Sequence, residues 1–271
     1  MLRNRPFIIK FSHQKTKHST LKIFITLLFL VSSGCNVEQQ KHNTLTTNEK
    51  KKGWDLLFDG YTFDGWRGLK MDKAPDGWII EDGTIKILPK THWPRQDDGQ
   101  PILGADLMTI ETFDNFELVW DWKIGPGGNS GVKYNVSEEL SILYPPKGCA
   151  LGFEYQMIDD TGLAGRSMHN STGALYDLVP PSEKKIFNPI NEFNTSRIIF
   201  RRRKGEHWLN GKKVLQFEVG TSHFDSLMKN SKFDTIPNFA IKRKGHIVLQ
   251  DHAEAAWFRN IKIRRLTLKD N

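Results

Sequence analysis

The chain has 271 residues, of which 38% are hydrophobic and 11% aromatic, a composition typical of a folded globular protein and not of a disordered or fibrous one. Its formal net charge of +8 arises from the first 52 residues, because residues 53–271 carry 29 basic and 29 acidic side chains. A neutral domain argues against a polyanion-binding function, so we expect no nucleic-acid partner. All eight tryptophans follow residue 52, which indicates that the folded core begins near Gly53.

Residues 1–34 are typical of an export signal. Residues 1–22 are basic and contain no acidic residue, and Ile23–Val31 form a mainly apolar run of nine residues, whereas a membrane span needs about 20. The following Ser32–Gly34 and Cys35 resemble a bacterial lipoprotein cleavage box, which makes Cys35 the predicted lipidation site; plain secretion with a free Cys35 thiol is the alternative. We therefore expect a periplasmic or cell-surface lipoprotein of a Gram-negative-type bacterium, held to the membrane only by its lipid.

Residues 35–52 are rich in Gln, Asn, Thr and Lys, so they predict a flexible polar tether. Residues 53–271 then form one domain. Their segments of β-branched and aromatic residues, separated by Gly, Asn, Pro and Asp, predict an all-β, two-layer antiparallel β-sandwich. With Cys35 lipidated, Cys149 has no partner for an intrachain disulfide, and its apolar neighbours indicate a buried, unreactive thiol.

Several segments predict their structure more closely. An alternating segment places Phe116, Leu118, Trp120 and Trp122 on one face of a strand. The remaining elements are a three-strand meander over Ser196–Val219 with turns at Lys204-Gly205 and Asn210-Gly211, short helical turns around Ser222–Lys229, and a further pair of strands at Gly245–Leu249 and Trp257–Leu266.

The usual motifs of nucleotide binding, metallohydrolases, dithiol or metal sites and serine nucleophiles are absent from the sequence. It contains no G-x-x-x-x-G-K-[ST], H-E-x-x-H, C-x-x-C or G-x-S-x-G. The Gly-rich stretch Gly125–Gly131 precedes a strand-like segment, whereas a phosphate-binding loop must open a helix, so nucleotide binding is disfavoured.

Polar residues within one predicted strand form the first part of a candidate site. In Gly152–Asp160 the two-residue period places Glu154 and Gln156 on one face, and Tyr155 and Met157 on the core face. Strict alternation would bury Asp159, so either the strand ends before it or a bulge brings it into the polar row.

A second part of the site comes from the segment after a distant strand. Gln250 and His252 share a face by the same rule, and a histidine near a carboxylate is a natural acid/base partner. Trp208 is a candidate platform for stacking against a sugar. The alternative for each of these residues is a structural or solvated position on the surface of the sandwich, or in the core for the tryptophan.

Eight segments in order resemble the 3-keto-disaccharide hydrolase domain family, which has a concanavalin A-like jelly-roll sandwich. They cover nearly all of residues 53–271, and they are LLFDGYTFDGW (56–66), GWIIEDGTI (77–85), NFELVWDWKI (115–124), GGNSGVKY (127–134), GFEYQMIDD (152–160), TGALYDLVPP (172–181), FNTSRIIFRRRKGEHWLNGKKV (193–214) and GHIVLQDHAEAAWFRNIKI (245–263). The family usually has Gly after the LQDH element, where this chain has Ala253.

This resemblance implies a sugar-binding face and an enzyme that cleaves oligosaccharides or other glycosides oxidised at C3. A C3 ketone acidifies the proton at C2, so a base can remove it and expel the group at C1, after which water adds. Glu154 and His252 are the candidate base and acid, in either order. Lys133, Gln156 or a bound cation is the candidate for polarising the ketone oxygen.

The remaining assignments complete the candidate site. The predicted substrate-binding residues are Asn129, Lys133, Gln156, Asp159, Tyr176, Trp208 and Gln250. Carboxylates such as Glu154 and Asp159 suit Ca²⁺ or Mg²⁺, but no ligand spacing identifies a metal site and no cofactor is assigned. Two alternatives stay open: a non-catalytic carbohydrate-binding lipoprotein, and a conventional glucanase, which needs Glu154 and Asp159 within roughly 5.5 Å of each other.

Overall fold

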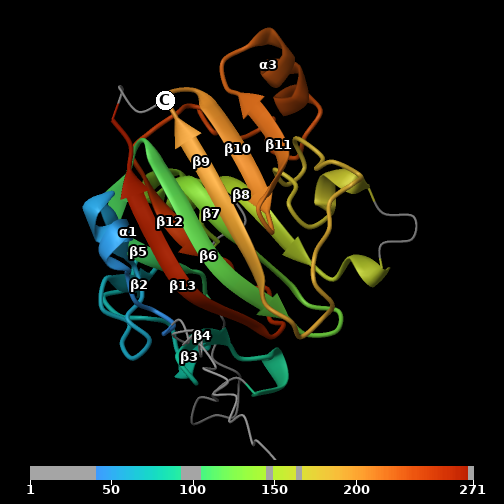
Figure 1. Cartoon of the computed structure of the whole chain (residues 1–271). Helices are drawn as coiled ribbons and strands as arrows, with labels where there is room; N and C mark the ends of the chain where they lie inside the picture. Colours follow the sequence, from blue (N-terminus) through green and yellow to red (C-terminus); the bar gives the residue numbers. More distant parts are fainter. Residues whose placement is uncertain (1–40, 93–104, 145–148, 163–166, 268–271) are drawn as a thin grey trace, which may run out of the picture. The chain divides into compact units, whose positions relative to one another are not determined.

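The computed structural model describes residues 41–92, 105–144, 149–162 and 167–267. In this part of the chain two antiparallel β-sheets pack face to face (Figure 1). Sheet A has the strand order β11-β10-β9-β6-β13-β4-β3, and β1 pairs with β13. Its strands are β1 (Trp54–Leu56), β3 (Trp78–Glu81), β4 (Thr84–Ile87), β6 (Phe116–Ile124), β9 (Asn194–Arg201), β10 (Lys204–Leu209), β11 (Lys212–Glu218) and β13 (Ala256–Arg265).

Sheet B has the strand order β2-β5-β12-β7-β8. Its strands are β2 (Trp66–Gly68), β5 (Leu107–Phe113), β7 (Asn129–Ser137), β8 (Leu151–Ile158) and β12 (Gly245–Leu249). The helices are short: α1 (Thr47–Lys51), α2 (Glu138–Leu143) and α3 (Ser222–Lys229), with 3₁₀ turns at Lys90–His92, Asp160–Gly162 and Met168–Asn170. These elements confirm the predicted all-β, two-layer antiparallel sandwich. None of the helices in the described residues has the length and apolar character needed to cross a bilayer.

The core lies between the two sheets and is built by strand alternation. On β6, Phe116, Leu118, Trp120 and Trp122 are buried as predicted. Phe200 on β9 completes an aromatic cluster with the core-facing rings of β7 and β8, whose members meet mostly edge to face. Such aromatic pairs add about 0.5–1.5 kcal/mol each beyond the area that they bury.

Polar side chains within the core tie the strands of sheet B to sheet A. The Trp122 indole donates to Ser196 Oγ at 2.8 Å, and Ser196 Oγ donates to Tyr155 Oη at 2.9 Å. On β7, Tyr134 Oη lies 2.8 Å from His207 Nε2, and burial lowers the pKa of His207 to about 3. These contacts fix the inner faces of β7 and β8, so the outer faces of the same strands are held rigidly.

The sequence located several of these elements correctly. The strand at Phe116–Ile124, the helix at Ser222–Lys229 and the turn at Asn210-Gly211, where both residues have positive φ, are as predicted. The turn predicted at Lys204-Gly205 is wrong, because Gly205 lies inside β10. A Cβ on Gly205 would come within 2.2 Å of the Phe217 ring, so packing of this ring and not a turn requires the glycine.

The two C-terminal strands do not form a pair, contrary to the prediction. β12 lies between β5 and β7 in sheet B, whereas β13 lies between β6 and β4 in sheet A. The connection at residues 250–255 therefore passes from one sheet to the other. This crossing carries Gln250 and His252, so it forms part of the candidate site.

The described part of the predicted tether, residues 41–52, is ordered. Asn43 is buried, its backbone N–H donates to Asn260 Oδ1 at 2.7 Å, and the Asn260 N–H donates to Asn43 Oδ1 at 2.8 Å. Thr46 caps α1 and forms a capping box with Glu49. Polar composition suggested disorder, but these polar groups form hydrogen bonds with Asn260, which lies in a bulge of β13. The predicted signal and the lipidation of Cys35 lie outside the described residues.

We predict that residues 41–52 contribute to the stability of the domain. Asn43→Ala leaves the Asn260 and Gly83 backbone groups without their partner, so it should lower the free energy of unfolding by about 2 kcal/mol. Thr44→Ala, at an exposed position, should change it by less than about 0.5 kcal/mol. Urea unfolding of both variants measures the free energy of unfolding. Equal stability of the two variants would show that residues 41–52 do not stabilise the domain.

Candidate active site

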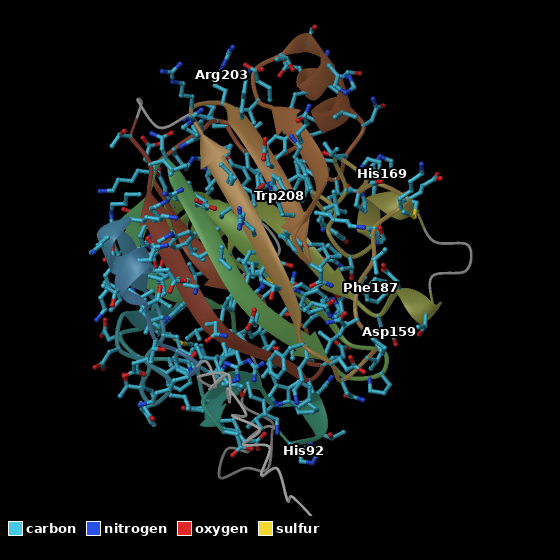
Figure 2. All side chains as sticks on the ribbon, viewed as in Figure 1. His92, Asp159, His169, Phe187, Arg203 and Trp208 are labelled. Atoms are coloured by element: carbon cyan, nitrogen blue, oxygen red, sulfur yellow. The ribbon has the colours of Figure 1, made fainter. Side chains whose placement is uncertain are left out.

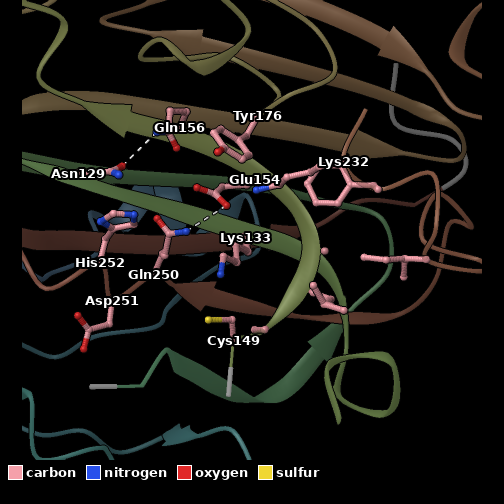
Figure 3. A pocket seen from close by; sticks show the side chains of 15 residues that line it. Asn129, Lys133, Cys149, Glu154, Gln156, Tyr176, Lys232, Gln250, Asp251 and His252 are labelled. Carbon is pink, nitrogen blue, oxygen red and sulfur yellow. Dashed lines mark hydrogen bonds between the residues drawn. The ribbon is translucent and has the colours of Figure 1, made fainter. Parts of the chain in front are cut away.

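A cavity of about 330 Å³ opens on the outer face of sheet B, at β7, β8 and the end of β12 (Figure 3). Seven of the nine residues predicted for catalysis or substrate binding line it: Asn129, Lys133, Glu154, Gln156, Tyr176, Gln250 and His252. The cavity lies at the small end of the range for ligand pockets, about 300–1,000 Å³. Two distant parts of the chain, near positions 154 and 252, therefore meet at one site.

Asp159 and Trp208 do not line the cavity; both are labelled in Figure 2. β8 ends at Ile158, and both carboxylate oxygens of Asp159 accept hydrogen bonds from the backbone of the adjoining turns, at Gly127 and Thr161. Trp208 belongs to β10 of sheet A, where its indole donates to Glu206 and Arg197 lies over its ring. Asp159 therefore stabilises turns, and Trp208 lies on sheet A, away from the cavity.

Glu154 is the central acidic side chain of the cavity. It is 7% exposed, and burial raises its pKa, with the positive charges of Lys133 and Lys232 offsetting only part of this effect. A Cβ on Gly131 of the neighbouring strand would lie 2.6 Å from Glu154 Oε1, so only glycine leaves room for this carboxylate. A buried carboxylate with a raised pKa is a stronger base than one in water.

Lys133 lies directly opposite Glu154 in the register of β7 and β8. Its Nζ donates to Asp106 Oδ2 at 2.8 Å, and both side chains are buried. Burial lowers the pKa of Lys133, but the negative charges of Asp106 and Glu154 outweigh this effect and the pKa lies above its usual value. Lys133 therefore stays protonated inside the protein.

Asp106 was missed in the sequence, yet it connects three walls of the cavity. Besides Lys133 on β7, its carboxylate accepts from the backbone N–H of Ala150 at 2.9 Å and of Asp251 at 3.0 Å. Ala150 precedes β8 and Asp251 precedes His252. No local pattern marks Asp106 in the sequence, because its partners are far along the chain.

Two amide side chains present hydrogen-bond acceptors to the cavity. Gln156 Nε2 donates to Asn129 Oδ1 at 3.1 Å, and Gln250 Nε2 donates to Glu154 Oε2 at 3.3 Å. Both nitrogens are thereby engaged, and within the described residues the two Oε1 atoms are buried without a partner. A buried acceptor without a donor is costly, so these oxygens are suited to receiving hydroxyl groups of a ligand.

His252 stands at the mouth of the cavity, with its side chain 51% exposed. Its Nδ1 lies 2.9 Å from Glu254 Oε2, and Nε2 has no hydrogen-bond partner among the described residues. The turn is stabilised by Asp251 Oδ1, which accepts from the Ala253 N–H at 2.8 Å. Ala253 has a φ of +67°, so the turn keeps a left-handed residue even though alanine replaces the expected glycine.

Three titratable side chains of the cavity were not predicted as site residues. Lys232 and Asp251 line the cavity, and burial raises the pKa of Asp251 to about 6. Cys149, expected to be buried, is half-buried in the cavity wall, and burial raises the pKa of its thiol, which disfavours the thiolate. Over the described residues, no group of three or more His, Cys, Asp or Glu side chains is arranged to hold a metal ion.

Comparison with known proteins identifies relatives over most of the chain. The family model described as the 3-keto-alpha-glucoside-1,2-lyase-like domain matches residues 53–264. A protein of Bacteroides thetaiotaomicron named 3-keto-disaccharide hydrolase is 34% identical, over 79% of this chain and 79% of its own length. The match to the family model spans every cavity residue discussed above.

Two solved structures from Parabacteroides distasonis, each described as a candidate glycosyl hydrolase, are similar to this chain. The first has a TM-score of 0.71 at 34% identity, with 84% of this chain and 100% of that chain covered. The second has a TM-score of 0.58 at 25% identity, with 79% and 99% covered.

We predict that the Asp106–Lys133 ion pair makes the cavity walls interdependent. Asp106→Asn leaves Lys133 buried without its counter-charge and should lower the free energy of unfolding by about 3 kcal/mol. The double variant Asp106→Asn/Lys133→Met should be more stable than the single variant, because the unpaired charge is removed. Both are measured by denaturant unfolding.

The matched control for this prediction is Asp114→Asn, which breaks an exposed ion pair with Lys242 and should cost less than about 1 kcal/mol. An Asp106→Asn variant no less stable than this control would contradict a structural role for the buried pair.

Proposed function

The chain belongs to the family of 3-keto-alpha-glucoside-1,2-lyase-like domains, and on that premise we propose that it cleaves 3-keto-glycosides by elimination followed by hydration. A glycoside-cleaving activity of the 3-keto-disaccharide hydrolase type agrees with its relatives. The observation that carries the proposal is the buried Glu154 carboxylate, which shares one cavity with His252 and with amide oxygens suited to sugar hydroxyls.

The proposed reaction uses Glu154 as base and His252 as acid. The carboxylate takes the proton from C2, and the electron pair of that C–H bond moves toward the C3 carbonyl, which becomes an oxyanion. The oxyanion re-forms the ketone, a C1=C2 double bond forms and the C1–O bond breaks, while the departing oxygen takes a proton from His252. Water then adds its hydroxyl to C1 and a proton to C2, so the net change is hydrolysis.

The positions of the two groups support this assignment of roles. Glu154 is buried and its pKa is raised, which suits proton removal from carbon. His252 is half-exposed at the mouth, where a departing group leaves, and Glu254 Oε2 lies 2.9 Å from its Nδ1 and orients the ring. The unpartnered oxygens of Gln156 and Gln250 can accept hydroxyl groups but cannot bind a ketone, so the C3 oxygen must face a donor elsewhere in the cavity.

We predict that Glu154→Gln lowers kcat/KM for a 3-keto-disaccharide by about 10³-fold, because the amide cannot accept the C2 proton. The unoxidised disaccharide should remain intact with the wild-type protein. Glu139→Gln, at an exposed position on α2, is the matched control and should behave as wild type. Cleavage of oxidised and unoxidised sugar at similar rates would remove the ketone from the mechanism.

We also predict an acid limb in the pH profile of kcat/KM. Glu154 works as a base only when ionised, and its pKa lies above 4.5, so activity should fall as the pH drops through a value higher than 4.5. Initial rates between pH 4 and 8 at low substrate concentration measure this limb. An acid limb at or below 4.5 would argue against Glu154 as the base.

A further inference from the structure

Lys232 lies on the cavity wall across Glu154 from His252 (Figure 3). Its Nζ is 4.0 Å from the centroid of the Tyr176 ring and 5.1 Å from that of Phe233. Although the residue is exposed, these two rings and the direction of the side chain bring the ammonium group toward the cavity.

The backbone beneath Lys232 is held firmly. Its N–H donates to Asp177 Oδ2 at 2.8 Å. The next residue, Phe233, is buried and stacks on Phe239 with centroids 4.1 Å apart. Lys232 therefore extends from an anchored segment and not from a free loop tip.

The two lysines of the cavity differ in their net electrostatic effect. Lys133 is already paired with the Asp106 carboxylate, so that pair carries no net charge. For Lys232, no carboxylate among the described residues lies within ion-pair distance, yet its charge acts on Glu154 and favours the ionised carboxylate. Lys232 thus supplies a positive charge to the cavity, and no acidic side chain in the described part of the chain pairs with it at close range.

The proposed reaction moves one negative charge over a short distance. Before proton transfer the charge is on the Glu154 carboxylate. Afterwards Glu154 is neutral and the charge is on the oxygen bonded to C3, two bonds from the C2 atom that lost the proton. A cation that faces both the carboxylate and the C3 oxygen stabilises the negative charge once it has moved to the oxygen. We propose, building on the proposed function, that Lys232 is a catalytic residue that holds the oxyanion formed on the substrate's carbonyl oxygen.

The test compares three variants on a 3-keto-disaccharide. Lys232→Met keeps the apolar stem that packs on Tyr176 but removes the charge; Lys232→Arg keeps the charge. Lys229→Met, at the exposed end of α3, is the matched control. We expect Lys232→Met to lower kcat by about 10²-fold with KM changed less than about threefold, as for loss of one oxyanion donor. Lys232→Arg should recover at least about a tenth of wild-type kcat, and the control should match wild type.

A second readout separates an electrostatic role from a structural one. Glu154 is faced by Lys133, Lys232, Asp106 and His252, and removal of the Lys232 charge should shift the acid limb of kcat/KM to higher pH. Loss of packing alone would leave the limb in place. Thermal unfolding checks that each variant is folded.

Two results would overturn the assignment of Lys232: a Lys232→Met variant with kcat within about threefold of wild type, or one in which only KM rises, which would indicate binding without oxyanion stabilisation. Failure of the proposed function looks different, because the wild-type protein itself would then show no preference for the oxidised sugar.

Discussion

The carboxylate of Asp106 is the contact on which the candidate site depends. It holds Lys133 of β7, the backbone at the start of β8 and the backbone of the crossing that carries His252. A buried charge is costly unless charge-assisted hydrogen bonds compensate for it, and here three such bonds come from three separate segments. Each wall of the cavity therefore stabilises the others, and Glu154 and His252 are kept at one site.

The sandwich provides the rigid support that such a site needs. The inner faces of β7 and β8 are locked to sheet A through Tyr134 and Tyr155. Alternation then turns Lys133 and Glu154 outward from the same strands. Side chains on strands are held more precisely than side chains on loops. The mouth, by contrast, is built from the crossing that carries His252, where the departing group leaves.

Local patterns in the sequence predicted the parts that depend on neighbours along the chain. The two-residue period placed Glu154 and Gln156 on one face, and Gln250 and His252 on one face. The acid/base chemistry of a histidine beside a carboxylate suggested that His252 belongs to the same site as Glu154. Contacts between distant segments had no such signal, so Asp106 and Lys232 were missed. The polar composition around Asn43 suggested a tether, because sequence alone does not show that a bulge at Asn260 needs those polar groups.

Removal of the C2 proton is the central step of this account, and cleavage of a 3-keto-disaccharide in D₂O tests it most directly. The position of deuterium in the product is read by NMR, and C4, which is also next to the ketone, serves as the internal control. The account predicts deuterium at C2 and hydrogen at C4. A product that keeps its original hydrogen at C2 would contradict elimination and indicate direct displacement at C1.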